Sequence, residues 1–136
     1  MADIEYRMEP PDPASFHRLF ELTGWDPDAR LDIDSAAAAV ARSWRIVCAW
    51  DGDRLVGTGR VVGDGVLHAL LADVIVEPEY RHLGVGSVIV RRLVAECVAA
   101  GIFDTQLFCA RGVRPFYERL GFVARPDDAP GMELAR

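Results

Sequence analysis

An arginine followed by two closely spaced glycines is the part of this sequence best suited to chemistry. It lies between an apolar run and a long stretch with helical periodicity, and it reads Arg81-His82-Leu83-Gly84-Val85-Gly86-Ser87. Glycine lets backbone approach a ligand closely, and the first N–H groups of a helix lack helical partners and attract negative charge. Together with the cation of Arg81, this arrangement predicts a cradle for an anion, and a pyrophosphate is the natural occupant.

Two well-known phosphate-binding motifs do not fit this segment. The dinucleotide fingerprint needs a third glycine where this chain has Ile89, and a P-loop needs a lysine. The chain contains neither lysine nor asparagine, and all of its basic residues are arginines. Any chemistry that depends on a lysine or asparagine side chain of this protein is therefore excluded.

The segment resembles the acyl-CoA-binding signature of the GNAT N-acetyltransferases, Arg/Gln-x-x-Gly-x-Gly/Ala. The family's second hallmark, Phe-Tyr-x-x-x-Gly-Phe in the last helix, resembles Phe116-Tyr117-Glu118-Arg119-Leu120-Gly121-Phe122. One expected strand separates the two segments, as in the family. The resemblance implies an acetyl-CoA-dependent N-acetyltransferase that moves an acetyl group to a primary amine of a small molecule or peptide. Transfer would occur by direct attack in a ternary complex.

The resemblance also assigns residues to the acyl-CoA site. Backbone N–H groups of Val74, Ile75 and Val76 would bind the acyl carbonyl and the pantetheine arm, where one oxyanion donor contributes about 3 kcal/mol in the transition state. The other cofactor-binding candidates are Arg81, His82, Leu83, Gly84, Val85, Gly86, Ser87, Arg111 and Phe116. His82 stands where many members have glycine. Arg111 lies near the position of a family asparagine, so it is either a substitute phosphate contact or a solvated loop residue.

Four further side chains are candidates for catalysis or acceptor binding. Tyr117 is the candidate general acid, because a phenol with a pKa of about 10 can protonate a thiolate whose thiol has a pKa of about 8.5. His68 is the candidate general base, since the ordinary pKa of histidine is about 6.5, with a structural role as the alternative. Asp73 and Trp25 are candidates for contact with the acceptor, and ordinary packing is the alternative for both.

The expected secondary structure places these residues around a central sheet. Strands are expected over 4–8, 46–50, 55–62, 66–76 and 103–109, with two more at 122–123 and 132–134. Helices are expected over 14–22, 84–100 and 113–120, and from a cap at Asp34 or Ser35 to residue 43. This order predicts an α/β fold with a mixed sheet of six to seven strands and about four helices on both faces. It agrees with the GNAT fold and not with a doubly wound Rossmann fold.

Composition narrows the partners that the chain can have. Its 136 residues predict one domain, 1–136, and a net charge of −6 argues against nucleic acid as a partner. Cys48, Cys97 and Cys109 form no C-x-x-C motif, so neither a disulfide nor a metal site is expected. No apolar run approaches the roughly 20 residues that span a bilayer, and no signal stretch opens the chain. A cytoplasmic protein without a membrane partner is therefore expected.

Other functions remain open beside an active N-acetyltransferase. The main alternative is a catalytically silent acyl-CoA-binding regulatory module that keeps only the cradle. An O-acyltransferase or protein-lysine acyltransferase is the third reading. Because members of the family are often dimers through their C-terminal strands, the resemblance also raises the expectation of a homodimer.

Overall fold

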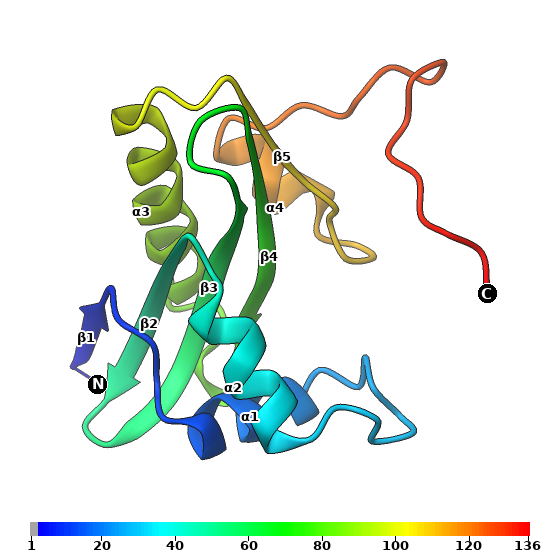
Figure 1. Ribbon diagram of the computed structural model, residues 1–136. Coiled ribbons are helices and arrows are strands. Elements are labelled where there is room, and N and C mark those ends of the chain that lie inside the picture. Colours follow the sequence, from blue (N-terminus) through cyan, green and yellow to red (C-terminus); the bar gives the residue numbers. More distant parts are fainter. Residues whose placement is uncertain (1–2) are drawn as a thin grey trace.

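The computed structural model describes residues 3–136, which form a five-stranded sheet with helices on both faces (Figure 1). The strands are β1 (Ile4–Arg7), β2 (Arg45–Asp51), β3 (Arg54–Gly63), β4 (His68–Val76) and β5 (Asp104–Leu107). The helices are α1 (Pro13–Glu21), α2 (Ile33–Ala41), α3 (Val85–Ala99) and α4 (Arg114–Arg119), with a short 3-10 helix η1 (Pro78–Tyr80). The strands lie in the order β1-β2-β3-β4-β5, and only β4 and β5 run parallel. The predicted mixed α/β fold is confirmed.

Alternating side chains along β2 divide the core into two layers. Ile46, Cys48 and Trp50 pack with α1 and α2 on one face of the sheet. Val47 and Ala49 pack with α3 on the other face. Successive residues of a strand point to opposite faces, so an unbroken apolar run is expected wherever helices cover both sides.

Aspartates begin the first two helices. The Asp12 carboxylate accepts a hydrogen bond from the Ser15 N–H at 3.0 Å at the start of α1. The Asp32 carboxylate does the same for the Ser35 N–H at 2.7 Å at the start of α2. The predicted cap at Asp34 or Ser35 was therefore wrong, because the aspartate two residues before Asp34 satisfies the free donor. Within residues 3–136, no helix is long and apolar enough to cross a membrane.

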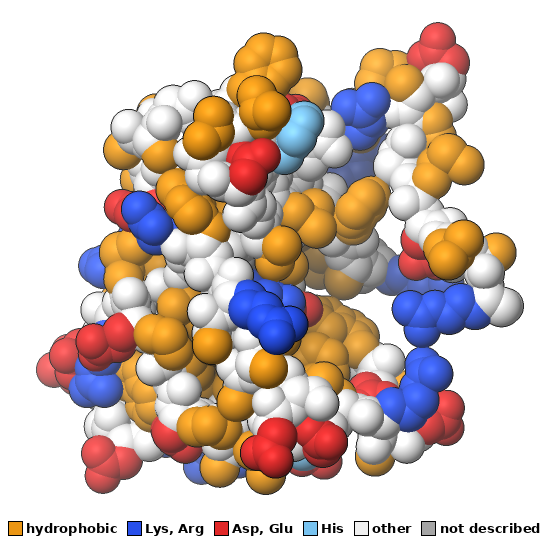
Figure 2. Space-filling view, viewed as in Figure 1, with side chains coloured by type: hydrophobic (Ala, Val, Ile, Leu, Met, Phe, Trp, Pro, Cys, Tyr) orange, Lys and Arg blue, Asp and Glu red, His pale blue; other side chains and the backbone are white. Residues whose placement is uncertain are grey.

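The C-terminal segment contains no helix or strand after α4, so the prediction of six to seven strands was wrong. The strands expected at 122–123 and 132–134 do not form. Val123, Met132 and Leu134 are 82% to 88% exposed. In the space-filling view this tail stands off from the body of the molecule, with a hollow between them (Figure 2). A strand is stable only when its backbone pairs with a neighbour, and the tail pairs with none of the described strands.

One extra residue in β4 interrupts its pairing with β3. At this point Gly59 of β3 faces two residues of β4, Asp73 and Val74, which defines a β-bulge. Asp73 occupies the bulge with a φ of +53°, a left-handed conformation that is uncommon for residues other than glycine. The bulge shifts the alternation by one residue. Ile75 therefore packs with the α1 layer, whereas unbroken alternation from Leu71 would have placed it beside α3.

Beyond the bulge, β4 and β5 separate. Their parallel pairing runs only from His68 with Asp104 to Leu71 with Leu107. Residues 72–76 of β4 consequently pair with β3 on one side and with no strand on the other. This free edge of backbone lies next to the point where α3 begins, and it positions the site described below.

Candidate functional site

A groove of about 760 Å³ opens where β4 separates from β5. Its walls are the end of β4, the loop between η1 and α3, the first turn of α3, the region from β5 to α4, and part of the loop between α1 and α2. The predicted residues that line it are Trp25, Val74, Ile75, Val76, Arg81, His82, Gly84, Val85, Gly86, Ser87, Phe116 and Tyr117. The volume falls within the range of roughly 300–1,000 Å³ typical of ligand sites.

The first turn of α3 presents free backbone donors to this groove. Gly84 precedes the helix with a φ of +83°, where a larger residue would be strained. The Val88 N–H donates to the Gly84 carbonyl at 3.1 Å and closes the first turn. The N–H groups of Val85, Gly86 and Ser87 therefore have no partner within the helix. A free helix N-terminus of this kind can bind an anion, and anion binding here stays a prediction.

The floor of the groove leaves little room beside Gly86. A Cβ atom at this position would lie 3.4 Å from Phe116 Cζ and 3.5 Å from Val76 Cγ2. A methyl group fits at these distances, whereas a longer side chain must displace Phe116 or extend into the groove. Arg81 lies nearby, and its Nε donates to the Val76 carbonyl at 3.3 Å. This contact places a fixed positive charge between the end of β4 and the cradle.

The end of β4 contributes backbone to the site and side chains to the core. Ile75 is only 4% exposed and packs toward α1, while Val74 and Val76 pack against the α3 layer. The groove runs along the edge of these three residues that β5 leaves free. This arrangement suits the predicted use of backbone N–H groups of Val74 and Val76 as hydrogen-bond donors, whereas Ile75 pairs with Thr58 of β3.

Tyr117 lies where the groove meets a second, smaller chamber, because it lines both. Its ring packs edge-on against Phe116 at a centroid distance of 4.9 Å and against Phe122 at 6.0 Å. Burial, with a smaller contribution from the nearby Cys109, raises the pKa of Tyr117 above its ordinary value. The phenol therefore remains protonated at neutral pH and can donate a proton.

The smaller chamber has a volume of about 220 Å³ and adjoins the groove at Trp25, Val74, Ala110 and Tyr117, which line both. Its remaining lining residues are Leu71, Ala72, Asp73, Phe108 and Cys109. The Asp73 carboxylate forms a salt bridge with Arg60, at 2.7 Å between Oδ2 and Nε. The chamber presents polar and apolar surface in about equal measure, and its carboxylate already has a partner.

Four predicted site residues do not line the groove: Asp73, which lines only the smaller chamber, and His68, Leu83 and Arg111. His68 begins β4 at the opposite end of the strand, about 20 Å from Val74 at roughly 3.3 Å per residue. Its Nδ1 lies 3.3 Å from a carboxylate oxygen of Asp104. Leu83 is 62% exposed in the loop before α3, and Arg111 is exposed between β5 and α4. The geometry gives no support to His68 as the general base.

Several lining residues have no place in the sequence-based prediction. Thr23 and Tyr80 lie within two residues of Trp25 and Arg81, which the prediction did name. Proximity to a motif could therefore have suggested them. Arg119 adds a second arginine to the groove, and it lies at a variable position of the second family motif.

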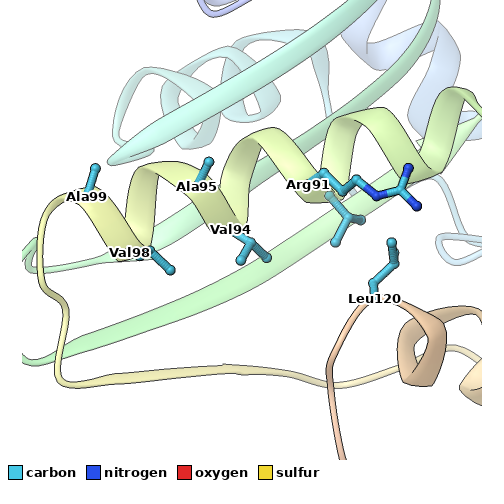
Figure 3. A pocket seen from close by; sticks show the side chains of 7 residues that line it. Arg91, Val94, Ala95, Val98, Ala99 and Leu120 are labelled. Atoms are coloured by element: carbon cyan, nitrogen blue, oxygen red, sulfur yellow. The ribbon is translucent and has the colours of Figure 1, made fainter.

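A separate hollow of about 390 Å³ lies between α3 and Leu120 (Figure 3). Its lining is apolar apart from Arg91, and Val94 and Val98 of α3 point to the side of the helix on which Leu120 lies. It offers no nucleophile, acid or base. Among residues 3–136, no group of three or more histidine, cysteine or acidic side chains could hold a metal ion.

Comparisons with known proteins agree with this geometry. GCN5-related N-acetyltransferase 1, chloroplastic, of Arabidopsis thaliana is 37% identical over 83 residues, which is 61% of this chain and 42% of the relative. Serotonin N-acetyltransferase 2, chloroplastic, of Oryza sativa subsp. japonica is 40% identical over 83 residues, again 61% of this chain and 42% of the relative. The matches thus span less than half the length of these two relatives.

Structural and family comparisons extend over more of the fold. A GNAT-family acetyltransferase of Streptococcus pneumoniae TIGR4 superposes with a TM-score of 0.80 at 27% identity, covering 100% of this chain and 98% of that protein. Residues 42–124 match the family model described as the acetyltransferase (GNAT) domain. This match includes the end of β4, the cradle and α4. The chain belongs to the GNAT acetyltransferase family.

Proposed function

We propose that this protein is an acetyl-CoA-dependent N-acetyltransferase that acetylates a primary amine by direct attack within a ternary complex. The observation that carries this proposal is one continuous path from the cradle at α3, along the free edge of β4, to the chamber beside Tyr117. A long ligand with a pyrophosphate at one end and a thioester at the other fits such a path. The amine would enter from the chamber side.

Different residues along this path have different roles in binding and catalysis. The N–H groups of Val85, Gly86 and Ser87, with Arg81, hold the pyrophosphate. Backbone donors of Val74 and Val76 orient the pantetheine arm and stabilise the negative charge that develops on the thioester oxygen. The amine nitrogen bonds to the thioester carbon, and the carbon–sulfur bond breaks. Tyr117 gives its proton to the sulfur and recovers one, through water, from the nitrogen of the new amide.

We propose that the acceptor is a small primary amine with an apolar body. The chamber of about 220 Å³ supports this size, and Trp25, Phe108 and Leu71 support the apolar character. The rice relative is named a serotonin N-acetyltransferase, which is consistent with an aromatic amine. The protein's acidic net charge of −6 would attract a cationic amine from solution.

A panel of primary amines with acetyl-CoA tests the function directly. We expect CoA release with at least one small aromatic or aliphatic amine and confirmation of the acetamide by mass spectrometry. Gly86→Leu should abolish CoA binding measured by calorimetry, because its side chain fills the cradle beside Phe116. Gly86→Ala is the matched control and should retain binding. Tight CoA binding without turnover of any amine would instead identify a silent acyl-CoA-binding module.

We also propose that the chain works as a homodimer. The free outer edge of β5 and the exposed apolar side chains of Phe108, Val123, Met132 and Leu134 support this proposal. A strand edge next to exposed apolar surface pairs readily with another chain.

A further inference from the structure

A buried carboxylate directly follows β4, between the backbone that lines the groove and the cradle. Glu77 is only 4% exposed and is the one charged residue in the buried core of residues 3–136. It does not line the groove. A buried charge is costly unless it is paired and hydrogen-bonded, so its partners indicate what it holds together.

Two arginines from different elements bind the Glu77 carboxylate. From the start of β3, Arg54 donates through Nε to Oε2 at 2.9 Å and through Nη2 to Oε1. From α1, Arg18 donates through Nη1 to Oε1 at 3.2 Å. Arg18 also donates through Nη2 to the Leu55 carbonyl at 2.6 Å. The carboxylate thus ties α1 to the sheet next to the end of β4.

The backbone of Glu77 fixes the loop that leads to the cradle. Its N–H donates to the Val56 carbonyl at 2.8 Å, and its carbonyl accepts from the Tyr80 N–H at 2.8 Å. The Tyr80 hydroxyl donates to Asp51 at 2.5 Å, and Tyr80 itself lines the groove. The next residue is Arg81, whose side chain returns to β4. The backbone contacts of Glu77 therefore fix the start of the loop that forms one wall of the groove.

Through Arg18, the same hydrogen-bond network also reaches the opposite wall of the groove, which the loop after α1 forms. Arg18 lies in the second half of α1, and the loop after this helix supplies Thr23 and Trp25 to the groove. The Thr23 hydroxyl donates to the Phe20 carbonyl at 2.7 Å and accepts from the Trp25 N–H at 3.1 Å. The Trp25 ring meets the Phe20 ring edge-on at 5.9 Å. The position of α1 therefore sets the position of this wall.

We propose that Glu77 is a positioning residue that holds the cradle loop and the α1 wall at a fixed separation across the groove. It touches neither substrate and acts through Arg18, Arg54 and its own backbone. The proposal rests on the proposed function of the groove as the site of both substrates. We call Glu77 with Arg18 and Arg54 the brace. Misplacement of about 1 Å far from the chemistry can cost about 100-fold in rate, so loss of these contacts should change the measured binding and kinetic constants.

Glu77→Gln tests the brace, because glutamine keeps the shape of the side chain and removes its charge. We expect the Kd for CoA and the KM for acetyl-CoA and for the amine to rise roughly tenfold each, with kcat changed less than about threefold. Arg18→Gln releases only the α1 side, so we expect it to raise the KM for the amine and to leave the Kd for CoA near wild type. The Arg18 side chain is 40% exposed, so we expect Arg18→Gln to fold. If Glu77→Gln does not fold, Arg18→Gln still tests the proposal.

Glu96→Gln is the matched control. Glu96 pairs with Arg45 at 2.9 Å on α3 and does not line the groove. We expect no change in its kinetic constants. A folded Glu77→Gln variant with a lower Tm but wild-type Kd and KM values would overturn the proposal, since a purely structural salt bridge behaves in that way. An unchanged amine KM in Arg18→Gln would overturn it as well.

The experiments distinguish failure of the Glu77 proposal from failure of the proposed function. Wild-type protein that binds CoA but acetylates no amine would contradict the proposed function, while the Kd of Glu77→Gln for CoA would still decide whether Glu77 positions the cradle. Active wild-type protein with an unaffected Glu77→Gln variant would leave the function intact and remove the positioning role.

Discussion

A protonated phenol at the junction of two cavities is the residue on which the proposed chemistry depends most. Tyr117 lines both the groove and the smaller chamber. Its pKa is raised by burial, so the proton that a departing thiolate needs is present at every pH below the ordinary pKa of tyrosine. The same proton becomes unavailable only when the pH rises through the raised pKa.

Replacing Tyr117 with phenylalanine keeps the ring packing and removes the proton. We expect kcat to fall about 100-fold, the scale of general acid catalysis by one side chain. Expressed per neutral amine, so that ionisation of the acceptor is removed, the wild-type rate should stay level with rising pH and decline only above about pH 10, the ordinary pKa of tyrosine. That alkaline decline should be missing in the variant. A pH–rate profile of both proteins measures this, and an unchanged rate in Tyr117→Phe would remove Tyr117 from the mechanism.

At the residue scale, local motifs brought the predicted cradle residues to the groove, whereas the predicted general base lies outside it. Arg81, Gly84 and Gly86 all line the groove because a local motif fixes their place relative to α3. His68 was chosen for its ordinary pKa, but it begins β4 while the groove lies at the end of that strand. Distance along the expected strand could have shown this. The role of Glu77 could not be foreseen, because its arginine partners lie 23 and 59 residues away in the chain.

The bulge in β4 is the element on which the shape of the site depends. It carries Asp73 at a φ of +53° and marks the place where β4 leaves β5. The salt bridge from Asp73 to Arg60 holds it, and Arg60 also donates to the Ala39 carbonyl and to the Ser43 hydroxyl. The left-handed backbone and the ion pair therefore reinforce the same conformation.

Two substitutions at Asp73 separate these contributions. Asp73→Asn removes the charge and keeps a side chain that tolerates the left-handed region, whereas the β-branched Asp73→Val does not. We expect valine to lower the free energy of unfolding by roughly 1–2 kcal/mol more than asparagine does. Urea unfolding followed by circular dichroism provides the comparison. Equal destabilisation would mean that the backbone conformation at this residue is not under strain.

At the element scale, the prediction succeeded where pattern and length agreed. The apolar run over 66–76 and the helical pattern over 84–100 each correspond to one observed element, β4 and α3. The strands expected at 122–123 and 132–134 were inferred from short apolar stretches, and such stretches form strands only beside a partner. The bulge could not be predicted for a related reason, because an extra residue in β4 can be recognised only from the pairing of β4 with β3.

At the scale of the whole molecule, the outer edges of β1 and β5 and the extended tail have no strand partner within residues 3–136. The fold as a whole could be predicted from the order of elements and from two motifs. What a second copy contributes could not, because no motif in the sequence describes a contact between chains.

Light scattering during gel filtration tests the proposed homodimer. We expect a particle of twice the chain mass of 15.0 kDa, and a shift to the monomer in a Val123→Asp, Leu134→Asp double variant. Both side chains are 88% exposed, so the substitutions should not disturb the domain itself. Val66→Asp, at a residue 66% exposed on the loop before β4, is the control and should keep the wild-type mass. A wild-type mass of 15.0 kDa would contradict the dimer.

The exposed thiol of Cys109 has a practical consequence. Cys48 and Cys97 are buried, so in the native protein Cys109 should react first with thiol reagents. An assay that detects released CoA with a disulfide dye would then begin with a burst of one equivalent per chain before any turnover. The same selectivity is useful, because a fluorophore attached to this native cysteine would lie at the smaller chamber and report binding of the proposed acceptor there without an introduced cysteine.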